Sequence, residues 1–152
     1  MLHALKELFD NLTAAEPELP PAQQVQLATA VLLVEVMRAD AGKTPAERQA
    51  VLAQLQQRFA LQGPALAQLV AQAEQSAEQA YDYHRFTASI NDHCSQPEKL
   101  QIVESMWQVA YADAQLGAHE HQVISKIADL LYVTHGEYIG AKMRAKEAAG
   151  LV

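Results

Sequence analysis

Apolar residues recur at helical spacing along most of this chain. Between Ala22 and Ala39, the side chains of Val25, Ala28, Leu32 and Val36 form one apolar stripe, as in an amphipathic helix. Strand-like alternation is nearly absent, and Ala, Leu, Gln and Glu, which favour helices, are abundant. The pattern predicts an all-α fold.

Start and stop signals divide the pattern into separate helices. A short helix is expected near the N-terminus, at about residues 3–11. Thr44-Pro45-Ala46-Glu47 and Ser95-Gln96-Pro97-Glu98 are typical helix starts, since Thr or Ser followed three residues later by Glu forms a capping box. Gly136 predicts a break before a last helix over Glu137–Ala149. Trp107, Met106, Tyr111 and Tyr132 are expected in the core.

Length and charge narrow the class of protein. The 152 residues suit a single domain over 1–152, and the net charge of -7 disfavours nucleic acid as a partner. One cysteine, Cys94, suits a reducing cytoplasm. The most apolar segment, Ala28 to Met37, is interrupted by Glu35 and is too short for a membrane span. We therefore expect a cytoplasmic protein with no membrane span.

The chain also resembles itself. A shift of 73 residues aligns an Asp, a Glu and a Gly of the first half with the same residue types in the second half. The aligned residues are Asp40 with Asp113, Glu47 with Glu120, and Gly63 with Gly136. The simplest architecture has two pseudo-repeated three-helix units, at about 28–75 and 101–148.

Each unit carries an Asp at the end of one helix and a Glu in the first turn of the next. The short connections bring Asp40 towards Glu47 and Asp113 towards Glu120. Clustered carboxylate oxygens suit a hard cation such as Ca²⁺ or Mg²⁺, although the spacing is not that of an EF-hand. A structural interpretation stays open, because a Glu in a capping box satisfies backbone N–H groups without a metal.

These residues resemble a known family. Leu32–Asp40, together with Glu47, resembles the first acidic motif of the TerB-like family, named for tellurite resistance. Val103–Asp113, followed by Glu120 and Ile127–Leu131, resembles its second motif.

The resemblance extends from about Ala28 to Lys146. It implies a compact bundle of about seven helices, a bacterial source and an acidic surface that binds metal. The acidic positions carried over, with Glu104 ranked after them, are Glu35, Asp40, Glu47, Asp113 and Glu120. The family commonly has Gly after the motif Asp, where this chain has Ala41 and Ala114, and Ala resists the left-handed backbone that Gly allows.

Two functions are consistent with these features. The first is a non-enzymatic accessory or stress-response domain that binds a divalent cation. The second is an interaction module whose acidic face docks a basic protein partner, with the Asp and Glu residues serving only as caps. No catalytic motif is recognised, and His119 and His121, two apart on a helix, do not face each other as chelating ligands would. An apolar stripe left exposed would allow a homodimer.

Overall fold

The central element of the fold is α2 (Pro21–Ala39), whose second half is buried almost completely. Between Ala28 and Met37 only Glu35 is partly exposed, because α3, α4, α5, α6 and α7 all pack against this helix. A helix that is apolar on every side is stable only when other elements surround it. The most apolar segment of the sequence is therefore the centre of the core.

The computed structural model describes residues 19–39, 45–79, 83–112 and 117–151. This part of the chain contains seven helices and confirms the all-α prediction. The six that follow α2 are α3 (Pro45–Phe59), α4 (Gly63–Gln79), α5 (His84–His93), α6 (Gln96–Ala110), α7 (Ala118–Leu130) and α8 (His135–Ala148). The helix predicted at 3–11 lies outside the described residues.

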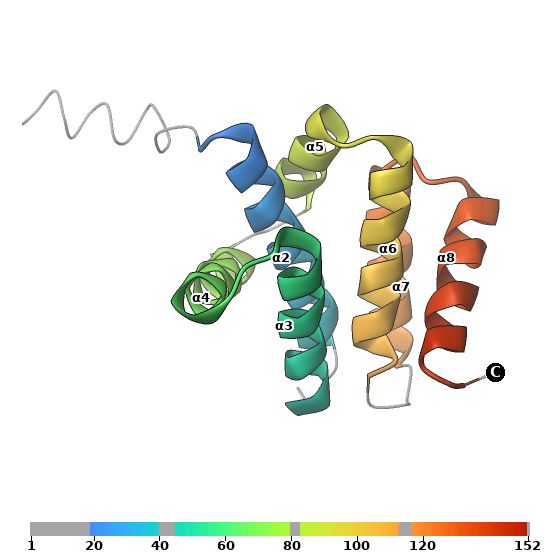
Figure 1. Ribbon diagram of the computed structural model, residues 1–152. Coiled ribbons are helices and arrows are strands. Elements are labelled where there is room, and N and C mark those ends of the chain that lie inside the picture. The colour runs from blue at the N-terminus through green and yellow to red at the C-terminus, as the bar shows by residue number, and fades with distance from the viewer. Residues whose placement is uncertain (1–18, 40–44, 80–82, 113–116, 152) are drawn as a thin grey trace, which may run out of the picture.

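Figure 1 shows how these helices surround α2. In this view α3 and α6 lie in front, with α7 behind α6 and α8 beside it. The helix α4 lies at the left and α5 at the top, and both pack against α2. The helices α2 and α6 end, and α3 and α7 begin, at the lower end of this view. We call this end of the bundle the corner end.

Helix starts follow the spacing noted in the sequence. The shift of 73 residues carries Pro45, the first residue of α3, onto Ala118, the first residue of α7. The helix α5 lies between the two groups of three, α2–α4 and α6–α8. Equal spacing along the chain does not show that the two groups of helices superimpose in space, so the internal duplication stays a prediction.

One predicted helix boundary is wrong. The chain leaves α7 at Leu131, and α8 begins at His135, so Gly136 lies inside its first turn. The reason is a strong start signal at Thr134, whose hydroxyl accepts a hydrogen bond from the Glu137 N–H at 3.2 Å. The glycine therefore marks no break.

The predicted core is confirmed except at Tyr132. Trp107, Met106 and Tyr111 are buried, whereas Tyr132 is 74% exposed. Tyr132 follows the end of α7 with a left-handed backbone (φ 59°), while the Val133 N–H closes the helix end on the Ala128 carbonyl at 3.1 Å. This conformation directs the ring outward, over the Lys99 ammonium 5.7 Å away.

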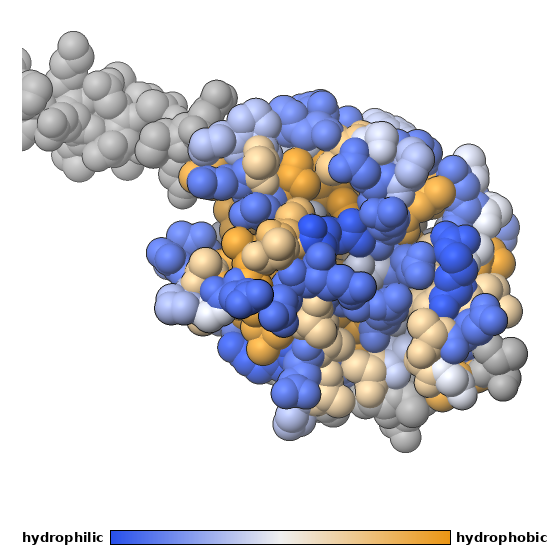
Figure 2. All heavy atoms as spheres, viewed as in Figure 1, coloured by the Kyte–Doolittle hydropathy of each residue, from blue (hydrophilic) through white to orange (hydrophobic). Residues whose placement is uncertain are grey.

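The face in Figure 2, viewed as in Figure 1, is mainly hydrophilic, with hydrophobic residues showing between the polar ones. Within the described ranges, no helix has the length and apolar character that a membrane crossing requires.

Candidate functional site

Four of the described helices have a glutamate as their third residue. In that position a side chain can accept a hydrogen bond from the backbone N–H that precedes the helix, and its charge complements the helix dipole. The four residues are Glu47 in α3, Glu98 in α6, Glu120 in α7 and Glu137 in α8. They occupy the same helix position but differ in burial.

Glu98 and Glu137 perform this role from the surface. Glu98 accepts a hydrogen bond from the Ser95 N–H at 2.9 Å, and Glu137 accepts one from the Thr134 N–H at 2.9 Å. These bonds lower the pKa of both carboxyl groups below the usual value, since they favour the charged form. Glu98 is exposed and Glu137 is partly exposed.

Glu47 and Glu120, in contrast, are removed from water. Their exposed fractions are 0% and 1%, which places them among the most deeply buried side chains described. Glu120 accepts a hydrogen bond from the Gly117 N–H at 3.0 Å, which is half of a capping box, since Gly117 has no side chain to return it. Both glutamates lie at the corner end, in the first turns of α3 and α7.

Burial of a carboxylate has a physical cost that capping alone does not require. Transferring an ionised group out of water costs several kcal/mol, unless opposite charge and hydrogen bonds compensate. Glu98 and Glu137 show that the same helix position functions at the surface. Helix capping alone therefore does not require the burial of Glu47 and Glu120.

A cation bound at the corner end would be one reason for this burial. Carboxylates are the ligands that Ca²⁺ and Mg²⁺ prefer. Among the described residues, no three His, Cys, Asp or Glu side chains gather in a group able to hold a metal. Asp40 and Asp113, the other predicted ligands, lie outside the described residues, so a site here needs their carboxylates.

Glu35 has partners of its own. One oxygen pairs with Arg38 Nη1 at 2.8 Å, and the other accepts a hydrogen bond from the Tyr83 hydroxyl at 3.4 Å. Burial, and then the nearby Glu35 carboxylate, raise the pKa of Tyr83. The charge of Glu35 is thus compensated within the chain, and its role as a metal ligand stays a prediction. Glu104 is paired similarly, with Arg144 at 3.1 Å.

The histidines next to Glu120 lie in different environments. His119 is exposed, while the His121 ring packs edge-on against Trp107 at a centroid distance of 5.6 Å. The two side chains therefore do not converge, as their spacing predicts.

Sequence reasoning missed the burial of the two glutamates, because local spacing does not reveal it. Glu47 and Glu120 each precede a buried apolar residue, Val51 or Ile124, by four positions. Glu98 and Glu137 stand at the same spacing from residues that are also buried, Ile102 and Ala141, although neither glutamate is itself buried. The burial therefore depends on how the helices pack at the corner end.

Comparison with known proteins identifies the family. A search of curated proteins and a search of solved structures found no match. A family model described as tellurite resistance protein TerB matches residues 26–143, which include α2 to α7 almost whole and part of α8. The match confirms the resemblance carried by the two acidic motifs, and the chain therefore belongs to the TerB tellurite resistance family.

Proposed function

We propose that this tellurite-resistance-like domain binds a divalent cation, Ca²⁺ or Mg²⁺, at the corner end. Glu47 and Glu120 are the proposed ligands within the described residues, and Asp40 and Asp113 are the proposed ligands from the segments beside them. The proposal rests on one observation: two glutamates are buried in a helix position where two others function at the surface.

The bound cation would offset part of the cost of burying the two carboxylates, because its charge would stabilise the ionised form of each glutamate. The chain's own residues hold the ion and exclude solvent from it. We assign it no reaction and regard it as a non-enzymatic accessory domain of a cytoplasmic stress response.

The burial of Glu47 and Glu120 also limits the alternative function, in which an acidic face docks a basic protein partner. A side chain that is 0% or 1% exposed presents no charge to another protein, so Glu47 and Glu120 do not serve this function directly. Glu35 is already paired with Arg38. Docking would have to use other surface carboxylates. A homodimer stays a prediction, which light scattering tests.

Thermal unfolding of the metal-free protein tests the proposal. A cation at about a hundred times its Kd stabilises the folded state by roughly 2.7 kcal/mol, which raises the Tm of a domain of this size by about 5–10 °C. Ca²⁺, Mg²⁺, Mn²⁺ and Zn²⁺ are compared, and Asp40→Asn with Asp113→Asn should remove the shift. An unchanged Tm at millimolar concentrations of all four metals would refute cation binding.

A further inference from the structure

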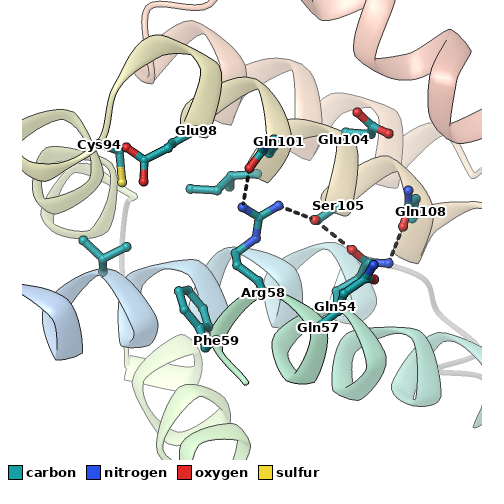
Figure 3. A pocket seen from close by; sticks show the side chains of 12 residues that line it. Gln54, Gln57, Arg58, Phe59, Cys94, Glu98, Gln101, Glu104, Ser105 and Gln108 are labelled. Carbon is teal, nitrogen blue, oxygen red and sulfur yellow. Dashed lines mark hydrogen bonds between the residues drawn. The ribbon is translucent and has the colours of Figure 1, made fainter. Parts of the chain in front are cut away.

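A polar groove separates α3 from α6 on the face that Figure 1 shows in front. Its volume is about 700 Å³, within the range of small-molecule sites. Figure 3 shows Arg58 in the middle, with glutamine side chains around it and Cys94 at one end. Neither Glu47 nor Glu120 lines the groove, so it is separate from the proposed cation site.

Arg58 is a cation with only neutral partners. Its Nη2 donates to Ser105 Oγ at 2.9 Å, and its Nη1 donates to Gln101 Oε1 at 3.4 Å. Its Nε is buried without a hydrogen-bond partner, and in the described part of the chain it makes no ion pair. Burial lowers the pKa of Arg58, and Cys94, Glu104 and Glu98 nearby oppose this shift only in part.

The two carboxylates that line the groove are already engaged. Glu98 accepts the Ser95 N–H at 2.9 Å, and Glu104 accepts from Arg144 Nε at 3.1 Å. Figure 3 shows the Glu104 carboxylate directed away from Arg58. Neither of these two described carboxylates forms an ion pair with Arg58, so the guanidinium is available to an external anion. These two negative charges, and the net charge of -7, disfavour a multiply charged anion such as a polyphosphate.

Amide groups line the groove beside the side chains of Val25, Phe59, Cys94 and Ile102. Four glutamines contribute to it, and each carries a hydrogen-bond donor and an acceptor: Gln54, Gln57, Gln101 and Gln108. Ser105 Oγ donates to Gln54 Oε1 at 2.9 Å, and Gln54 donates in turn to Gln108. Such side chains match the N–H and C=O groups of a peptide-like ligand.

We propose that this groove binds a free carboxylate adjacent to an amide, with Arg58 holding the carboxylate and the glutamines holding the amide. A guanidinium suits a carboxylate because its donors lie in the plane that a bidentate contact needs. The chemistry is that of a peptide C-terminus or of a free N-acylated amino acid.

The binding test uses N-acetylalanine as the probe and N-acetylalaninamide, which lacks the charge, as the matched control. Side-chain amide signals of the groove glutamines are followed by NMR. We expect a Kd on the order of millimolar for such a small ligand, and binding at least about tenfold weaker for the control. Equal binding of both probes, or no binding of N-acetylalanine, would overturn the proposal.

Two variants show whether Arg58 is the anchor. Arg58→Gln should weaken probe binding by at least about tenfold, whereas Arg48→Gln, on the same helix but paired with Glu74 at 2.9 Å, should leave it unchanged. If Arg58→Gln does not fold, Gln101→Glu replaces it. This exposed position lies 3.4 Å from Arg58 Nη1, so the new carboxylate should occupy the guanidinium and abolish binding. Unaltered binding in Gln101→Glu would contradict the proposal.

A third probe separates the two sources of the ligand. N-acetyl-trialanine ends in the same carboxylate but reaches further along the groove. Tighter binding than N-acetylalanine supports a peptide C-terminus, and equal binding supports a small N-acylated amino acid.

Discussion

The two ends of the bundle use the same residue at the same helix position in opposite ways. Glu47 and Glu120, at the corner end, are buried, whereas Glu98 and Glu137 begin their helices in contact with water. All four are the third residue of a helix. A capping hydrogen bond explains the choice of glutamate at Glu98, Glu120 and Glu137. Capping does not require the burial of Glu47 and Glu120. This difference is the basis of the cation site that we propose at the corner end.

Charge reversal should give the largest contrast between the two ends. Glu47→Lys or Glu120→Lys buries a cation at a helix N-terminus, so each should lower the free energy of unfolding by about 3–5 kcal/mol. Glu98→Lys, in exposed surroundings, should cost about 1 kcal/mol or less. Urea unfolding measures both. Similar losses of unfolding free energy at the two ends of the bundle would contradict the distinction between buried and exposed glutamates.

Lowering the pH should reveal how much Glu98 and Glu137 contribute to the stability of the fold. The pKa of Glu98 and of Glu137 lies below the usual value of 4.5, because their carboxylates accept hydrogen bonds from Ser95 and Thr134. A lowered folded-state pKa gives stability that is present above the usual value and is lost as the pH falls through the folded-state pKa.

Replacing both residues, Glu98→Gln with Glu137→Gln, should therefore flatten the fall in Tm between about pH 5 and pH 3. Glu78→Gln, on an exposed part of α4, is the control and should leave the curve unchanged. A variant pair with the same acid profile as the wild type would show that these capping bonds contribute no acid-dependent stability.

The smallest effect is expected at the start of α7. Gly117 occupies the N-cap position with an extended backbone (φ -79°, ψ 154°), so Gly117→Ser adds the hydroxyl that caps α6 and α8. The new Cβ would lie 3.4 Å from Glu120 Oε1, an ordinary contact. We expect a gain of a few tenths of a kcal/mol, measured as a slightly higher Tm. A loss above about 1 kcal/mol would mean that the surroundings of Glu120 have no room for a hydroxyl.

The sequence predicted the helices well because their signals are local. The stripe through Val25 and Val36 identified α2, and the capping box at Ser95 placed the start of α6 within one residue. The predicted helix break at Gly136 was wrong because the Thr134 cap begins the helix before this glycine, which lies in the first turn. The prediction that Tyr132 is buried was wrong because helical periodicity does not extend past the end of α7, where Tyr132 has a left-handed backbone.

The sites were less predictable, because they depend on how distant segments pack. The motifs located the Asp and Glu residues, but only the assembled bundle shows that Glu47 and Glu120 are buried. The sequence did not predict a role for Arg58, since an arginine among glutamines is typical of a solvent-exposed helix face. Its contact with Ser105, 47 residues away, brings it into the groove.

Calorimetric titration with Ca²⁺ and Mg²⁺ tests the central claim most directly. The buried pair, Glu47→Gln with Glu120→Gln, is compared with the exposed pair, Glu98→Gln with Glu137→Gln, and with the wild type. We predict that the wild type and the variant of the exposed pair bind the same cation with similar affinity. The variant of the buried pair should bind it at least about a hundredfold more weakly, since two charged ligands are removed. Absence of binding to the wild type, or equal binding by both pairs, would contradict the account.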